Sequence, residues 1–102
     1  MPWFIKQETF TEAMTTLPLE QRRQHCADHR DWVQEQREAG LRIASGFLVD
    51  AAQKPGGGGL LVFEAASYGA AEGLIRQDPM IARGLVEWTL HEWRPVAGDD
   101  LL

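Results

Sequence analysis

The sequence contains a single cysteine, few positive charges and no long apolar segment. One cysteine excludes an internal disulfide. Ten Lys and Arg against fifteen Asp and Glu give a net charge of −5, which argues against the phosphate backbone of a nucleic acid as a partner. The first ten residues lack the features of a signal peptide, and no apolar run approaches the length of a membrane span. These absences favour a cytoplasmic protein that binds neither nucleic acid nor membrane.

The size and composition are those of a small globular protein. Of the 102 residues, 44% are hydrophobic and 25% are charged, close to the average for this class. A chain of this length can bury one hydrophobic core but has no room for a substrate domain beside a cofactor domain. We therefore expect one domain over residues 1–102.

Residues 19–40 have the apolar spacing of an amphipathic helix. Positions on one face follow at steps of three and four: Leu19, Arg22, Cys26, His29, Val33 and Gln36. This pattern predicts a buried stripe with His29 at its middle, and an acidic opposite face in contact with solvent. Gly40 suits the position that ends the helix.

Four segments have the composition or the two-residue alternation typical of β-strands. They cover residues 3–9, 41–49, 60–65 and 85–96. In the first, Phe4 and Lys6 are predicted to share a face, while the third is apolar on both faces and is predicted to be central. Residues 10–18 are expected to be a connection, and residues 50–59, with four consecutive glycines, a mobile hairpin loop.

A second helix is predicted from a capping Ser67 to about residue 77. Its expected buried residues are Ala70, Ala71, Leu74 and Ile75. Asp78 precedes Pro79 and should end this helix, after which residues 79–83 can form one more turn that Gly84 closes. Residues 97–102 are expected to be a tail.

The predicted order of elements is βαββαβ, the order of a ferredoxin-like α+β fold with a four-stranded antiparallel sheet. This fold packs both helices on one side of the sheet and leaves the other side uncovered. The uncovered face here mixes Trp and Leu with Glu, Thr and His, which is more apolar than a solvated face requires. We therefore predict a homodimer that forms through the open face.

His29 and Asp78 are the candidates for acid-base chemistry. A fixed, partly desolvated imidazole can titrate near neutrality. The fold brings the end of the second helix near the first, so an aspartate at position 78 can orient the ring. Each residue also has a structural interpretation: a histidine on a buried stripe is more often a satisfied core residue, and Asp before Pro is a good helix N-cap.

Other candidate sites have weaker signals. His25 and His29 are four apart, but the spacing supplies no third ligand, so no metal site is expected. A thiol–base pair of Cys26 and His29 competes with the interpretation of Cys26 as a small buried hydrophobe. The glycine run lacks the Lys-Ser or Lys-Thr of a phosphate loop. Arg22 lies inside the stripe and can hold an anionic substrate group or Asp78.

With these landmarks, the sequence resembles the YciI-like family of small ferredoxin-like dimers. This family is related in fold to dimeric α/β barrel enzymes such as muconolactone isomerase. The matching positions span nearly the whole chain: Leu19, Glu20, Arg22, His29, Gly40, Gly46, Ser67, Asp78, Pro79 and Gly84. Departures occur at Ser45 and Phe47, where the family commonly has alanine and proline, and at Cys26 and Ala27, where it often has Arg-Pro.

The resemblance implies a function. It assigns His29 and Asp78 as a catalytic pair for proton transfer on a small organic molecule, of the isomerase or dehydrohalogenase type, without a cofactor. The departures lie beside the expected pocket, between the first helix, the Asp78 turn and the sheet, and Ser45 and Arg22 are the expected substrate contacts there. The alternative is a non-catalytic dimeric binding or accessory domain that has the same fold.

Overall fold

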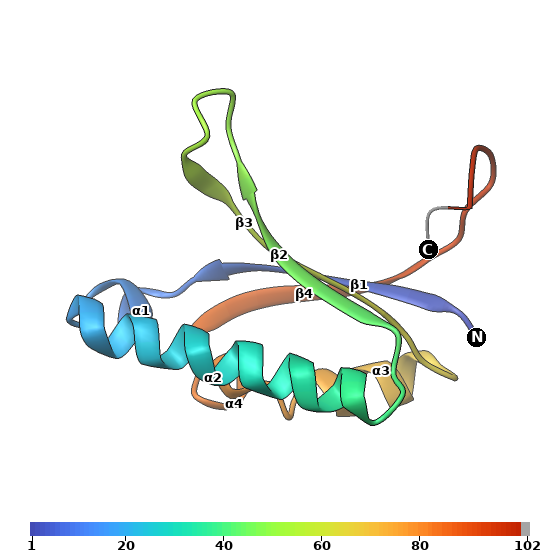
Figure 1. Cartoon of the computed structure of the whole chain (residues 1–102), viewed down its shortest axis with the longest axis horizontal. Coiled ribbons are helices and arrows are strands. Elements are labelled where there is room, and N and C mark those ends of the chain that lie inside the picture. Colours follow the sequence, from blue (N-terminus) through green and yellow to red (C-terminus); the bar gives the residue numbers. More distant parts are fainter. Residues whose placement is uncertain (101–102) are drawn as a thin grey trace.

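The computed structural model describes residues 1–100 and contains a four-stranded antiparallel sheet with its helices on one side (Figure 1). The elements in chain order are β1 (Trp3–Phe10), α1 (Glu12–Thr15), α2 (Leu19–Glu38), β2 (Ile43–Val49), β3 (Pro55–Glu64), α3 (Tyr68–Ile75), α4 (Pro79–Ala82) and β4 (Val86–Trp93). This is the ferredoxin-like α+β fold, as the sequence predicts.

The strands lie in the order β2-β3-β1-β4, so β1 and β3 are central. Phe4 of β1 lies opposite Phe63 of β3 and Glu92 of β4. Phe4 and Lys6 both face the helices and are fully buried, which confirms the predicted face of this strand. The predicted central position of the third strand is confirmed too.

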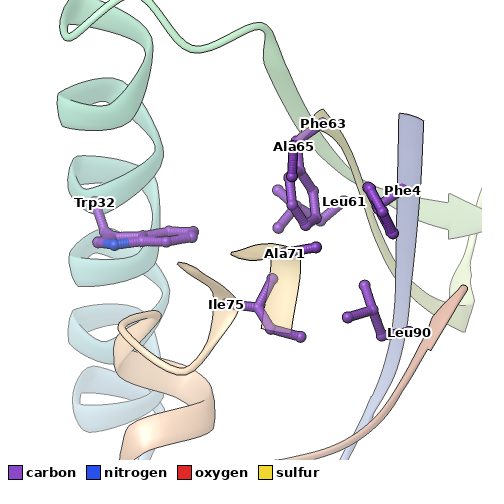
Figure 2. Close-up of a cluster of buried hydrophobic side chains, with 8 residues drawn as sticks. All are labelled: Phe4, Trp32, Leu61, Phe63, Ala65, Ala71, Ile75 and Leu90. Carbon is purple, nitrogen blue, oxygen red and sulfur yellow. The ribbon is translucent and has the colours of Figure 1, made fainter. Parts of the chain in front are cut away.

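The main core lies between α2, α3 and the sheet (Figure 2). Trp32 reaches from α2 toward Phe63 and Ile75, and the rings of Phe4 and Phe63 stack with their centroids 6.1 Å apart. Trp32 is the one buried residue of α2, with 7% of its surface exposed, whereas Leu19 is 51% exposed. The predicted stripe was therefore wrong at Leu19, the first residue of α2, whereas Cys26 and Val33 of the stripe pack against the two core clusters.

The short elements differ from expectation in two places. Residues 10–18 are not a plain connection, because α1 forms there and buries Met14 in a second cluster with Met80 and Val86. In α3, Ser67 caps the helix as predicted, with its Oγ accepting from the N–H of Ala70 at 3.1 Å. Ala70 itself is exposed, so its predicted burial was wrong.

The four glycines do not form a mobile loop, since β3 begins at Pro55 and includes them. The turn is shorter and is held by Asp50, whose Oδ1 accepts from the N–H groups of Ala52 and Lys54. At Gly58, φ is +86°, and a Cβ would lie 2.3 Å from the backbone oxygen of Glu8. At Gly57, Gly58 and Gly59 the neighbouring strands approach too closely for a side chain, whereas Gly56 has free space.

The sheet surface opposite the helices, called the open face below, is uncovered. It carries alternate residues of all four strands: Trp3, Ile5, Gln7, Ala44, Gly46, Leu48, Leu60, Val62, Glu64, Glu87, Thr89, His91 and Trp93. No helix within residues 1–100 is long and apolar enough to cross a membrane. Of the expected tail, residues 97–100 form no helix or strand, and residues 101–102 lie outside the described residues.

The role of Gly58 can be tested by substitution. We expect Gly58→Ala to lower the free energy of unfolding by about 2–4 kcal/mol, since alanine is strained at positive φ and its Cβ collides with β1. Gly56→Ala is the matched control, because a Cβ there meets nothing within 4 Å; its effect should stay within about 0.5 kcal/mol. Urea unfolding measures both, and equal losses would contradict the assignment.

Candidate active site

His29 lies in the middle of α2, and its two ring nitrogens have different partners. Nδ1 is 2.9 Å from Oδ2 of Asp78, and Nε2 is 2.7 Å from Oγ of Ser45. Because an ionised carboxylate can only accept, Nδ1 is the donor, and Nε2 of the neutral ring accepts the hydroxyl proton of Ser45. The contact between His29 and Asp78 expected from the sequence is therefore present, and the imidazole is held in one tautomer.

Asp78 is fully buried at the N-cap of α4 and uses its two oxygens differently. Oδ1 accepts from the N–H of Met80 at 3.0 Å, while Oδ2 contacts His29. Burial alone would raise the pKa of Asp78, but the hydrogen bond from His29, the charge of Lys6 and the Met80 N–H together hold this pKa below its usual value. Capping the helix and orienting the histidine are thus compatible roles.

Lys6 supplies a buried cation that the sequence analysis assigned to no site. Its Nζ lies 3.1 Å from Oδ2 of Asp78 and 3.0 Å from Oε1 of Glu8, and its side chain is fully buried. Oε2 of Glu8 is also buried and has no partner within residues 1–100. A signal was available: the alternation placed Lys6 on the core face with Phe4, and a buried ammonium needs a carboxylate partner.

Ser45 forms the exposed end of this line of contacts. It lies on β2 opposite Leu61 of β3, which in turn lies opposite Lys6 of β1. One row across the sheet therefore places the hydroxyl under His29 on the helix-facing side. The imidazole side chain is 13% exposed, and its contact at Nε2, Ser45, is exposed to solvent.

Arg22 is not part of this cluster. It lies two turns before His29 on α2, about 10 Å along the helix axis. Its Nε donates to the backbone oxygen of Leu17 at 3.1 Å, and it lines a hollow of about 470 Å³ together with Arg23 and Arg30. The expectation that Arg22 can hold Asp78 was wrong, because the buried Lys6 takes that position.

A second hollow, of about 340 Å³, lies along β2 and is lined by residues that include Trp3, Ile43 and Ala44. Neither hollow is lined by His29 or Asp78. The cavity expected between the first helix, the Asp78 turn and the sheet is therefore neither of these two. The hollow along β2 ends one residue from Ser45.

His25 and Cys26 have other surroundings. Arg83 donates to Nδ1 of His25 at 2.8 Å and forms an ion pair with Asp28 at 2.7 Å, so His25 and His29 face different partners. Within residues 1–100, no group of three or more His, Cys, Asp and Glu side chains is arranged to hold a metal ion. Burial raises the pKa of the Cys26 thiol. A thiol–base pair with His29 is also disfavoured because both imidazole nitrogens have other partners.

The sequence profile of the YCII-related domain matches residues 4–94, which is most of the chain. The chain belongs to the YCII-related family. This confirms the family that the sequence landmarks indicate. No curated protein is similar enough to this YCII-related chain in sequence to count as a match.

Three solved structures share the fold of this YCII-related chain. The 5-chloro-2-hydroxyhydroquinone dehydrochlorinase of Burkholderia phenoliruptrix, in complex with 2,5-dihydroxybenzoquinone, aligns with a TM-score of 0.64 and 19% identity over 92% of this chain and 94% of its own. Muconolactone isomerase aligns with a TM-score of 0.57 and 20% identity over 96% and 98%. An antibiotic biosynthesis monooxygenase aligns with a TM-score of 0.55 and 17% identity over 95% and 100%. These identities establish the fold, not the activity.

The buried charges of this YCII-related chain can be tested by unfolding. We expect Lys6→Met to lower the free energy of unfolding by about 3–5 kcal/mol, because it leaves two buried carboxylates without their cation. Adding Glu8→Gln removes one of these charges, so the double variant should be more stable than Lys6→Met alone at pH 7.

Arg42→Met is the matched control for this experiment. Its exposed ion pair with Glu64 spans 3.4 Å, and its loss should cost less than about 1 kcal/mol. If Lys6→Met is no more damaging than Arg42→Met, or if Glu8→Gln gives no recovery, Lys6 does not stabilise the cluster through its charge.

Proposed function

We propose that this chain is a cofactor-independent enzyme in which His29 takes a proton from a small organic substrate. The observation that carries this proposal is the 2.9 Å contact between Nδ1 of His29 and the buried carboxylate of Asp78. An aspartate in this position fixes the imidazole tautomer and leaves Nε2 as the base. Nε2 is also the nitrogen that contacts Ser45, whose side chain is exposed to solvent.

Two related reactions need only this group. In an isomerisation, Nε2 removes a proton from one carbon and returns it to another. In a dehydrohalogenation, Nε2 removes the proton, the electron pair of the broken C–H bond forms a double bond as the halide leaves, and the proton then passes from Nε2 to water. In both reactions, the substrate replaces the Ser45 hydroxyl at Nε2, and this hydroxyl binds the substrate by a hydrogen bond. Asp78 and Lys6 act as positioning residues.

The solved structures of similar fold support this choice of reactions. One is described as a dehydrochlorinase of a chlorinated hydroquinone and another as an isomerase of a lactone. We propose a substrate of the same broad class, a small ring compound that carries oxygen substituents. Where the substrate has an anionic group and is long enough to reach the hollow at the start of α2, Arg22 is its second contact.

Activity assays on two substrates test the proposal. We expect the purified protein to release chloride from 5-chloro-2-hydroxyhydroquinone or to isomerise muconolactone, and His29→Gln to lower kcat by about 100-fold or more, since it removes the general base. Asp78→Asn should also lower kcat, because it loses the acceptor that fixes the tautomer.

His25→Gln is the matched control for the activity assay, because it changes a histidine one turn away whose partner is Arg83. It should leave kcat unchanged, and circular dichroism verifies that each variant is folded. If neither substrate is turned over, or if His29→Gln is as active as the unchanged protein, the chain is better described as a binding or accessory domain.

We also propose that two copies pair through the open face. That face carries exposed apolar side chains, with Trp93 39% and Leu48 41% exposed. Sedimentation velocity should give a species of twice the 11.5 kDa chain mass. Val62→Lys, at the centre of the open face, should produce monomers, whereas Leu19→Lys, an exposed apolar position on α2, should not. A monomeric unchanged protein at micromolar concentration would contradict the pairing.

A further inference from the structure

Ser45, His29 and Asp78 form a continuous line in which a hydroxyl contacts an imidazole and the imidazole contacts a buried carboxylate. The two contacts measure 2.7 Å and 2.9 Å. A base whose far nitrogen is held by an acid is the arrangement that activates a serine hydroxyl as a nucleophile. We propose that Ser45 is such a nucleophile, and that the chain transfers the acyl group of small esters to water.

Ser45 is accessible in the way that a nucleophile requires. It is exposed, whereas the acid at the other end of the line is fully buried. It also lies on β2, which is an edge strand of the sheet. A substrate can therefore approach the hydroxyl from the side of the sheet without displacing another strand.

The backbone of β2 offers a donor for the negative charge that develops on an ester oxygen. In an antiparallel pair, alternate residues point their N–H and C=O groups toward the partner strand. The backbone oxygen of Arg42 accepts from the N–H of Glu64 at 3.1 Å, so Arg42 points toward β3. By alternation, the N–H of Ser45 points away from β3, out of the sheet edge. In serine hydrolases the N–H of the nucleophile is one of the oxyanion donors.

The surroundings of Ser45 define the class of ester. Ile43 and Phe47 flank it on the same side of β2, and Phe47 is 69% exposed. The hollow of about 340 Å³ beside β2 is lined by Trp3, Ala44 and Val62 of the open face, so it is not the pocket for the acyl group. Ile43 and Phe47 are apolar, so they suit an ester with a small aromatic or aliphatic group.

The reaction balances with water as the second substrate. As Oγ of Ser45 bonds to the carbonyl carbon, Nε2 of His29 takes the hydroxyl proton and the carbonyl π electrons move to the oxygen. The tetrahedral species then expels the alcohol, which leaves with the proton from Nε2. Water attacks the acyl-serine in the same way, releasing a carboxylic acid and restoring the Ser45 hydroxyl.

Covalent labelling tests the nucleophile without a known natural substrate. Diisopropyl fluorophosphate phosphorylates an activated serine with loss of fluoride, and the chain contains two serines, Ser45 and Ser67. We expect one adduct per chain, located at Ser45 by peptide mass spectrometry. Hydrolysis of p-nitrophenyl acetate should accompany it, and both rates should fall at least 100-fold in Ser45→Ala and in His29→Gln.

Ser67→Ala is the matched control, since Ser67 caps α3 away from the cluster, and it should be labelled as fast as the unchanged protein. An adduct on another residue, no adduct on the folded protein, or equal ester hydrolysis by Ser45→Ala would overturn the inference. The same variant distinguishes this inference from the proposed proton transfer. Ser45→Ala should mainly raise KM for proton transfer, whereas it should abolish acyl transfer. Loss of one activity with retention of the other therefore identifies which proposal fails.

Discussion

The buried carboxylate of Asp78 is the interaction on which the rest of the site depends. Removing a carboxylate from water costs several kcal/mol unless charges and hydrogen bonds replace the lost hydration. Here three donors on three elements do so: Lys6 on β1, His29 on α2 and the N–H of Met80 on α4. These contacts stabilise the buried carboxylate, and the contact with His29 also fixes the imidazole against the sheet. The same hydrogen bonds therefore lower the cost of burying Asp78 and set the geometry of the site.

This arrangement also explains how α2 serves the core and the site at once. His29 and Trp32 are neighbours on one helix, with ring centroids 6.2 Å apart. Trp32 anchors the helix in the apolar core, and His29, one turn earlier, is thereby held at the border between that core and the polar cluster. Trp32 is the one residue of α2 that is buried in the core cluster, so the indole adds an apolar contact to the polar contacts that place His29.

The sequence was sufficient for the order of the strands and the two longer helices, the faces of the first strand and the approach of His29 to Asp78. Each follows from local periodicity or from the geometry of the fold. The sequence was insufficient where contacts between segments far apart in the chain determine the structure. The place of the glycine run in β3 depends on the close approach of Gly58 to Glu8, which the local sequence does not show. The pairing of Lys6 with Asp78 depends on which side chains lie beside Lys6 in the folded sheet. The burial of Leu19 was predicted wrongly for a similar reason, since the periodicity of α2 does not show that its first residue lies outside the core.

The position of Ser45 has a consequence for the two proposed activities. Nε2 of a neutral imidazole has one lone pair, so it can accept a proton from the Ser45 hydroxyl or from a substrate carbon, but not from both. The substrate therefore determines which of the two reactions takes place. A molecule that inserts an acidic C–H between Ser45 and His29 separates the hydroxyl from its base and leaves proton transfer as the available reaction. An ester that approaches along the edge of β2 leaves the 2.7 Å contact intact, and the serine keeps its base.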